Sequence, residues 1–307
     1  MPNIAILVPA FNSRKTIEEA LDSIATQQGI EDVKSVHLVD DRSTDDTVEI
    51  ASRIQHMKPP LQISVRATNV GQWHNVNNAL HELEPRAEWV LILHSDDIAK
   101  PLWVSTMAAR IAACPQSVAT ICSSWDVLSA DGRVRPGEDS DRPVELIRGE
   151  RDSVRGTLLR GCWWHISGCA IRVAAFKDVG DFQPDLAVGD WEWLLRCLAR
   201  GWSVEYVPRS LIVYRNHDAS ISSGSFRTHR DIREGLGVLR TFVGYLSLSE
   251  ITRVHAKRGY HLVRRVATSI ARSQFERLAT ALLMLVVTAA SLASCLKVKL
   301  AGTLRFG

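Results

Sequence analysis

The sequence predicts an α/β protein built on a mainly parallel sheet. Two observations support this: short apolar segments alternate with helix-like segments over the first hundred residues, and polar clusters follow the apolar segments. The expected strands are residues 4–8, 33–39, 61–65 and 89–93, and the expected helices between them are residues 16–27, 44–55 and 74–83. This βαβ rhythm is typical of a parallel sheet with helices on its faces.

Several local signals refine this arrangement. Ser43 followed three residues later by Asp46 is a capping-box-like pair, which predicts the start of the second helix. Residues 131–155 are polar and interrupted by Pro and Gly, so we expect a mobile excursion there that gates substrate access. Beyond it we expect a strand within residues 163–172 and a helix over residues 190–200 with leucines on one face.

The charge is distributed unevenly along the chain. Residues 1–226 hold 23 Lys and Arg against 30 Asp and Glu, a net charge of −7, whereas residues 227–307 hold 14 against 4, a net charge of +10. An acidic body argues against nucleic acid as a partner, while a basic tail suits an anionic membrane surface or an anionic lipid carrier. The six cysteines form no C-x-x-C pair and no signal-peptide pattern precedes them, which favours a reduced, cytoplasmic setting.

The tail also contains a long apolar segment. Residues 278–296, LATALLMLVVTAASLASCL, carry no charge, and about 20 apolar residues suffice to cross a bilayer. Basic residues flank the segment on both sides and are more numerous on its N-terminal side. This excess favours a cytoplasmic location for the rest of the chain. The alternatives are a membrane-associated helix, spanning or lying on the surface, and a core helix diluted by Ser, Thr and Cys. We therefore expect a domain at 1–226, a basic helical region at 227–277 and an apolar helix with a short basic tail at 278–307.

Polar clusters stand where the first four strands end. They are residues 9–12, 40–41, 69–71 and 94–97, and in open parallel sheets ligands bind beyond the carboxyl ends of the strands. Carboxylate oxygens suit Mg²⁺ or Mn²⁺, which complete their coordination with water and phosphate, so Asp96 and Asp97 predict a diphosphate ligand. The alternative is that one of them caps the helix expected near Pro101.

A second pair of carboxylates, Asp40 and Asp41, would repel phosphate. Either can accept a hydrogen bond from a base N–H or a ribose hydroxyl, although D-D-R-S-T is also ordinary turn chemistry. Pro9 offers a similar choice, because the backbone around it either meets a planar base or simply ends a strand.

Together these residues resemble a known family. Six motifs occur in the order and approximate spacing of family 2 glycosyltransferases of the GT-A fold, over about residues 3–222: VPAFN (8–12), VDDRSTDDT (39–47), NVGQWHNVNNAL (69–80), LHSDD (93–97), GDWEWLLRCLARG (189–201) and YRNHDASIS (214–222). The resemblance implies a Rossmann-like GT-A domain that transfers a sugar with inversion from a nucleotide diphosphate donor, most often a UDP-sugar.

The resemblance also implies roles for individual residues. Pro9, Ala10, Asp40 and Asp41 match the nucleoside site, and the polar clusters add Asn12 and Asn69 to this nucleotide-binding set. Asp96 matches the last residue of the family's D-x-D metal motif, and His217 matches a histidine that approaches the metal–diphosphate group. Asp190 matches the general base, which must lie across the sugar from the metal; Glu192 is the rival base and points to another side of the helix.

Two positions depart from the family pattern. Position 94 is His where many relatives have Asp; His94 is expected to contact the donor or to pack at the strand end. Val76 stands where many members place Arg, and Asn75 and Asn77 are expected to replace some of its hydrogen bonds. Trp163 and Trp164, with Asp97, complete the candidate donor or acceptor contacts, although paired tryptophans are more often core residues.

The sequence thus predicts a metal-dependent, membrane-associated glycosyltransferase. It takes a nucleotide-sugar donor and a glycan or lipid-linked acceptor, in bacterial-type surface polysaccharide or glycolipid synthesis, on the inner face of the cell membrane. Two alternatives stay open: a degenerate nucleotide-sugar binding protein, motivated by His94 and Val76, and a nucleotidyltransferase, although PAFNSRKT lacks the glycines expected of its phosphate loop.

Overall fold

The computed structural model describes residues 2–54, 57–217, 224–225, 228–271 and 275–304. Its contacts divide the chain into two units. Unit 1 comprises residues 1–150, 164–184 and 193–217, and unit 2 comprises residues 151–163, 185–192 and 218–307. The domain boundaries expected at residues 226 and 277 remain predictions.

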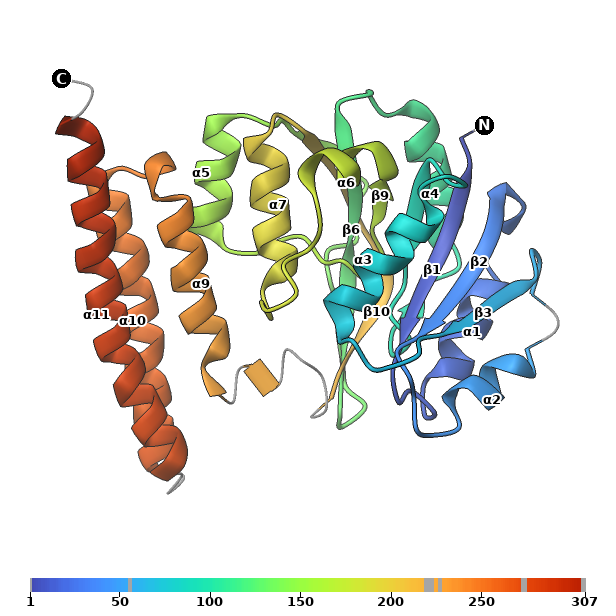
Figure 1. Ribbon diagram of the computed structural model, residues 1–307, viewed down its shortest axis with the longest axis horizontal. Coiled ribbons are helices and arrows are strands. Elements are labelled where there is room, and N and C mark those ends of the chain that lie inside the picture. The colour runs from blue at the N-terminus through green and yellow to red at the C-terminus, as the bar shows by residue number, and fades with distance from the viewer. Residues whose placement is uncertain (1, 55–56, 218–223, 226–227, 272–274, 305–307) are drawn as a thin grey trace. The chain divides into compact units, whose positions relative to one another are not determined.

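Unit 1 is built on one ten-stranded sheet (Figure 1). Eight strands follow the order β3-β2-β1-β4-β9-β6-β10-β5, and two short strands pair with β6 and β10 outside this order. The first four strands in this order are mutually parallel: β3 (Leu61–Val65), β2 (Val33–Asp40), β1 (Ile4–Ala10) and β4 (Trp89–Ile92). The others are β9 (Ala170–Arg172), β6 (Val118–Ser129), β10 (Ser203–Asn216) and β5 (Ile98–Ala99), and β9 is antiparallel to both neighbours. The predicted α/β fold and its four leading strands are confirmed.

The helices of unit 1 connect these strands. They are α1 (Ile17–Ala25), α2 (Thr47–Ser52), α3 (Gln72–Leu83), α4 (Trp103–Ala113) and α6 (Val173–Val179). The predicted capping box before α2 is wrong. The N-cap is Asp46 without a side-chain cap, and the Ser43 hydroxyl instead donates to the Asp40 carboxylate.

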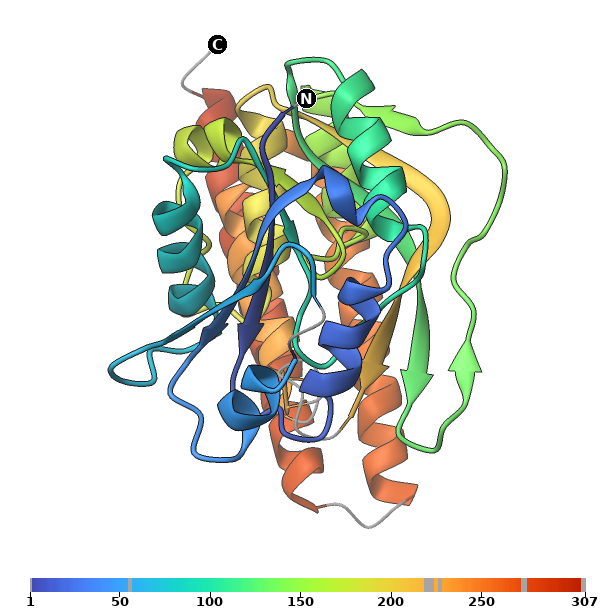
Figure 2. The same cartoon turned by 90° about the vertical axis from the view of Figure 1, so that its right-hand side faces the viewer.

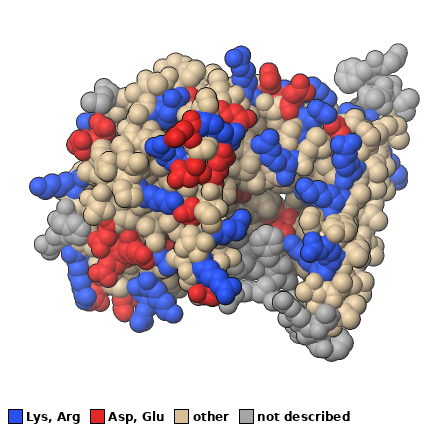
Figure 3. All heavy atoms as spheres, turned by 180° about the vertical axis from the view of Figure 1, so that it is seen from behind, with Lys and Arg blue, Asp and Glu red and all other residues tan. Residues whose placement is uncertain are grey.

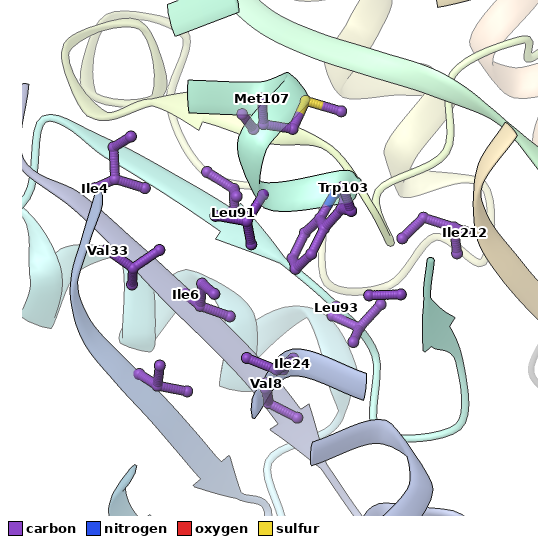
Figure 4. Packing of buried hydrophobic residues seen from close by; sticks show 14 of the residues in the cluster. Ile4, Ile6, Val8, Ile24, Val33, Leu91, Leu93, Trp103, Met107 and Ile212 are labelled. Carbon is purple, nitrogen blue, oxygen red and sulfur yellow. The ribbon is translucent and has the colours of Figure 1, made fainter. Parts of the chain in front are cut away.

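The core explains why β1 is apolar throughout. Ile4, Ile6 and Val8 point to one face of the sheet, where they join α1 and α4 side chains such as Ile24, Trp103 and Met107 (Figure 4). The alternate residues of β1, including Leu7, are also buried, because α3 covers the opposite face. A strand buried on both faces reads as a continuous apolar run, as expected in a parallel sheet.

The structure refines two predicted segments. Residues 131–155 contain two short strands, β7 (Val134–Arg135), which pairs with β6, and β8 (Glu145–Ile147), which pairs with β10 (Figure 2). The mobility and the gating role expected of this segment remain predictions. The strand expected within residues 163–172 is β9, and Gly168, with φ +86°, precedes it.

Unit 2 is helical. It contains α5 (Arg151–Arg160), the start of α7 (Gly189–Ala199), α9 (Arg230–Thr241), the short η2 (Val243–Tyr245), α10 (Leu248–Ala271) and α11 (Phe275–Leu304). Among the described residues, one helical segment, Leu278–Ala301, is long and apolar enough to cross a membrane, with a mean hydropathy of 2.1, and most of it is not buried. The predicted helix over 190–200 is confirmed, with Leu194, Leu195 and Leu198 all buried.

Trp103 is expected to be one of the most important residues for the stability of unit 1. Its ring is fully buried and its indole N–H donates to the Gly168 carbonyl at 2.8 Å. Trp103→Ala should lower the free energy of unfolding by about 3–5 kcal/mol, because it leaves a cavity and an unsatisfied carbonyl. Urea denaturation with the half-exposed Leu102→Ala as control measures this, and equal, small losses for both variants would contradict the packing described.

Candidate active site

The carboxyl ends of the parallel strands bring the polar clusters to one edge of the sheet. Ala10 at the end of β1 pairs with Asp40 at the end of β2, and Leu7 pairs with Ile92 of β4. The loops that follow are joined by side chains, since the Ser13 hydroxyl lies 2.7 Å from the Ser95 hydroxyl. The sequence therefore placed this edge correctly.

Three side chains after β4 are grouped as metal ligands would be. The donor atoms of His94, Asp96 and Asp97 all lie within 4.8 Å of one another. His217, directly after β10, places its Nε2 2.9 Å from Asp96 Oδ2. The Asp96 side chain is 30% exposed, so a cation or another ligand in solution can reach its carboxylate.

Asp97 is the buried member of this group. One of its carboxylate oxygens accepts a hydrogen bond from the Arg215 N–H at 2.9 Å, and the other has no hydrogen-bond partner in the described chain. Burial, reinforced by the charge of Asp96, raises the pKa of Asp97 to about 8. A buried carboxylate is stable as an anion only beside a positive charge, so the donor set fits a divalent cation.

His94 fits the same cation. Burial lowers its pKa, so the imidazole is neutral at pH 7, and its buried Nε2 has no hydrogen-bond partner among the described residues. A neutral imidazole nitrogen is a ligand that Mn²⁺ accepts more readily than Mg²⁺ does. The helix-cap alternative for Asp96 and Asp97 is wrong, because the N-cap of α4 is Leu102.

Arg215 holds in place the loop after β4 that carries Asp96 and Asp97, a role that sequence reasoning missed. Besides its N–H bond to Asp97, its guanidinium donates to the Asp96 carbonyl at 2.9 Å and to Glu19 of α1 at 2.6 Å. The only sequence signal was its place next to His217 in YRNH. Residues 218–222 of that motif lie outside the described residues.

The predicted nucleoside residues lie at the carboxyl ends of β1 and β2 and in the loops after β1, β2 and β3. Pro9 and Ala10 are buried within β1, whereas Asn12 is exposed and has φ 49°. The side-chain oxygen of Asn12 accepts a hydrogen bond from the Thr44 N–H at 2.8 Å, which ties the two loops together. Phe11, between Ala10 and Asn12, exposes 47% of its surface at the sheet edge, a feature that sequence reasoning missed.

Asp40 and Asp41 are both buried and bind the protein itself. Asp40 accepts hydrogen bonds from the backbone and hydroxyl of Ser43. Asp41 accepts bonds from the N–H groups of Val70 and Gly71, both at 2.8 Å, and the Asn69 amide donates to its carbonyl at 3.0 Å. These contacts hold the loops after β2 and β3 against each other.

The asparagines of α3 do not replace the missing arginine. Asn75 donates to the Val39 carbonyl and accepts a bond from Arg66, while Asn77 bonds both the N–H and the carbonyl of Phe182. Both side chains are buried, so the prediction that they take over hydrogen bonds of the missing arginine is wrong. Their amide groups are instead used in hydrogen bonds to other strands and loops, which a sequence does not show.

Asp190 lies in the first turn of α7, which begins in unit 2 and ends in unit 1. Its carboxylate accepts a bond from the Trp191 N–H at 2.7 Å, and burial raises its pKa to about 6. Glu192, two residues on, is buried and points to a different side of the helix. Arg258 of α10 lies over the Trp191 ring at 5.7 Å and packs this start of the helix.

The tryptophan pair is divided between packing and partial exposure. Trp164 is fully buried, donates to the Thr120 hydroxyl and stacks on Trp193 at 5.7 Å, so we drop it from the candidate contacts in favour of the core alternative. Trp163 is half-buried and donates to Thr157 of α5 at 3.1 Å. Close to His94, the half-buried rings of Trp125, His165 and Tyr214 form a further aromatic group.

The chain is similar to known proteins. The family model for glycosyl transferase family 2 matches residues 5–178, more than half of the chain. The succinoglycan biosynthesis protein ExoO of Rhizobium meliloti is 30% identical over 133 residues, 43% of this chain and 36% of that protein. The poly(ribitol-phosphate) beta-N-acetylglucosaminyltransferase TarS of Staphylococcus aureus is 38% identical over 112 residues, 36% of this chain and 19% of TarS. The matches to these two relatives thus cover about a third and a fifth of their lengths.

Solved structures share the fold. The structure of TarS residues 1–349 with UDP-GlcNAc superposes with a TM-score of 0.60 at 17% identity, covering 91% of this chain and 90% of that one. The mannosyltransferase PcManGT of Pyrobaculum calidifontis, in complex with GDP-Man and Mn²⁺, superposes with a TM-score of 0.58 at 19% identity, covering 99% and 81%. The chain therefore belongs to glycosyl transferase family 2 and has a GT-A fold.

Proposed function

We propose that this glycosyltransferase moves a sugar, with inversion, from a nucleotide diphosphate donor to an acceptor hydroxyl. The observation that carries the proposal is the group of His94, Asp96 and Asp97 after β4, in a loop that the Ser13–Ser95 contact joins to the loop carrying the exposed Phe11. A cation-binding group and a flat apolar side chain at the same end of the sheet suit a ligand that joins a diphosphate to a base. UDP is the preferred nucleotide, as in the TarS complex.

On the diphosphate side, Asp96 would hold Mg²⁺ or Mn²⁺, with Asp97, His94 and His217 close by. The bound cation supplies charge neutralisation for the departing diphosphate. Asp97 is buried, so its part is to fix the loop and to share the cation's charge. Arg215 holds this segment through its bonds to the Asp97 carboxylate and to the Asp96 backbone carbonyl, and Glu19 anchors its guanidinium.

On the nucleoside side, we assign base stacking to Phe11. Base–aromatic stacking is worth about 1–3 kcal/mol per base, and an exposed phenyl ring at a ligand-binding edge is the group that provides it. Asp40, Asp41 and Asn69 shape the pocket by holding the loops, and Asn12 offers its exposed amide to the ribose or the base. Pro9 and Ala10 supply the rigid strand end beneath them.

Asp190 is the proposed general base. Inversion requires the acceptor hydroxyl to attack from the face of the sugar opposite the diphosphate, and a base there accepts its proton. A pKa of about 6 keeps Asp190 ionised at pH 7 yet close enough to neutrality to accept a proton efficiently. Glu192 is the alternative base, and Trp163 a candidate acceptor contact.

The acceptor is proposed to be a glycan or lipid-linked glycan of the cell surface. Support comes from relatives named for succinoglycan biosynthesis and for poly(ribitol-phosphate) glycosylation. We place the enzyme in the cytoplasm at the inner face of the cell membrane, with its C-terminal helices at the membrane and no nucleic-acid partner.

A screen of nucleotide sugars for metal-dependent release of nucleoside diphosphate tests the proposal. We expect release with a UDP-sugar and Mn²⁺ or Mg²⁺, and loss of that release on addition of a chelator. Binding of nucleotide sugar without turnover of any donor–acceptor pair would favour the non-catalytic alternative. Release of pyrophosphate from a nucleoside triphosphate would favour nucleotidyl transfer.

Removing the Phe11 ring should weaken nucleotide binding. Phe11→Ser is expected to raise the Kd for UDP about tenfold, whereas Phe11→Tyr keeps the stacking face and should leave the Kd within about twofold. Titration calorimetry in the presence of Mn²⁺ measures both values. A Kd unchanged in Phe11→Ser would mean that the base binds elsewhere.

A further inference from the structure

Helix α11 shows an apolar surface on the side opposite to its packed side. Its buried residues are Ala281, Met284, Thr288 and Cys295. Most of the exposed apolar residues of α11 follow the same helical spacing about half a turn away, and they include Leu282, Leu283, Val286, Ala289, Ala290, Ala293 and Leu300. Leu283 and Val286 expose 58% and 66% of their surface. A soluble helix normally presents polar residues there.

The neighbouring helix α10 extends this surface. The two helices lie side by side along their length (Figure 1), joined by contacts such as His255 Nε2 to the Ser291 hydroxyl at 3.1 Å. Tyr260, Val263 and Ile270 of α10 expose 61%, 53% and 60% of their surface. Val263 and Ile270 lie on the opposite side of α10 from Arg265, which bonds Asp231 of α9, so this apolar edge faces away from α9.

Basic side chains border the apolar surface. Arg253, Lys257 and Arg264 are exposed on α10 and, at spacings of four and seven residues, share one side of the helix. Lys297 is exposed near the end of α11. Between residues 251 and 301 the sequence holds nine Lys and Arg against one acidic residue, Glu276. Figure 3 shows clusters of basic side chains next to uncharged surface on this part of the molecule.

We propose that one face of the α10–α11 pair binds the surface of an anionic bilayer. This α10–α11 face has an apolar part and a basic border. The apolar part consists of Leu282, Leu283, Val286, Tyr260, Val263 and Ile270, and the border consists of Arg253, Lys257 and Arg264. The apolar residues would enter the headgroup–acyl boundary, while the basic residues contact anionic lipid headgroups. This inference rests on the proposed placement of the enzyme at the membrane and names its docking surface.

The packing of α10 against α11 decides between spanning and lying on the membrane. If α11 crossed the bilayer, α10 would enter the hydrocarbon with it, carrying Arg253, Lys257, Arg258, Arg264 and Arg265. Each such charge costs about 2.5–3.5 kcal/mol at the centre of a membrane helix. The opposite side of α11 is occupied by protein, since Lys299 donates to the Gly244 carbonyl of η2 at 3.1 Å. The hairpin therefore lies in the interface and does not span.

Vesicle co-sedimentation of the full chain tests this surface. We expect binding to vesicles of phosphatidylglycerol and phosphatidylcholine, much weaker binding to phosphatidylcholine alone, and release by high salt without detergent. The triple variant Arg253→Gln, Lys257→Gln, Arg264→Gln should bind anionic vesicles about 100-fold more weakly, because each basic residue contributes about fivefold. Leu283→Ser with Val286→Ser should weaken binding at least about tenfold.

The matched control removes three exposed charges elsewhere, as Lys34→Gln, Arg53→Gln, Arg133→Gln, and should bind like the parent. An equal loss of vesicle binding in the control would show that only the net charge of the chain matters, and it would overturn the assigned surface. Protein that resists salt and alkaline extraction would overturn interfacial binding in favour of spanning. A dimer that Leu283→Ser with Val286→Ser dissociates, without vesicle binding, would assign the surface to a second copy. Release of nucleoside diphosphate in vesicle-free solution tests the proposed function separately.

Discussion

Asp96→Ala is expected to abolish sugar transfer, lowering kcat/KM by about a thousandfold or more. Asp96 is the exposed carboxylate of the His94, Asp96 and Asp97 group, and His217 lies 2.9 Å from it. Losing it removes the ligand that would hold the cation at the diphosphate, and charge stabilisation there is worth several kcal/mol. Initial rates of nucleoside diphosphate release across a range of Mn²⁺ concentrations measure the effect.

The control for this variant is Asp131→Ala, which removes an exposed carboxylate in the loop before β7. It should retain the parent's rate and metal dependence. If Asp96→Ala and Asp131→Ala respond to Mn²⁺ alike, the cation is bound somewhere other than the sheet edge.

Asp190→Asn should lower kcat by about 10²–10⁴-fold while leaving the Kd for the donor nearly unchanged. The amide has the same shape and still accepts the hydrogen bond from the Trp191 N–H, but it takes up no proton. The matched control is Asp152→Asn, an exposed first-turn carboxylate of α5, which should behave like the parent. A parent-like kcat in Asp190→Asn would move the role of base to Glu192.

The pH profile gives an independent check on Asp190. Burial raises its pKa to about 6, and a general base works only when deprotonated. In the parent, kcat/KM should therefore be constant above about pH 7 and fall tenfold per pH unit well below pH 6. The residual activity of Asp190→Asn should lack this acid limb. An acid limb that persists unchanged in the variant would belong to another group.

Strand positions and the sheet edge could be predicted because they depend on local patterns. Apolar runs such as 4–8 and 89–93 are buried on both faces, and polar residues must follow where such strands leave the sheet. His94, Asp96 and Asp97 were identifiable for this reason. Asp96 and Asp190 belong to different units, and the transfer kinetics of their two variants test the roles assigned to them.

Side-chain partners could not be predicted, because they depend on residues distant in the sequence. Ser43 bonds Asp40 instead of capping α2, and Asn77 bonds the backbone of Phe182, 105 residues away. Arg215 reaches Glu19 across 196 residues. Trp164 and Trp163 are neighbours in sequence, yet one is buried in an aromatic cluster and the other is half-exposed. None of these outcomes leaves a periodic signal.

We propose above all that the carboxyl end of the sheet in unit 1 binds a nucleoside diphosphate together with a divalent cation through Asp96. Titration calorimetry of UDP with and without Mn²⁺, on the parent and on Asp96→Ala, measures this directly. We predict that Mn²⁺ tightens UDP binding at least tenfold in the parent and has no effect on affinity in Asp96→Ala. UDP affinity that is the same in all four titrations would contradict the claim.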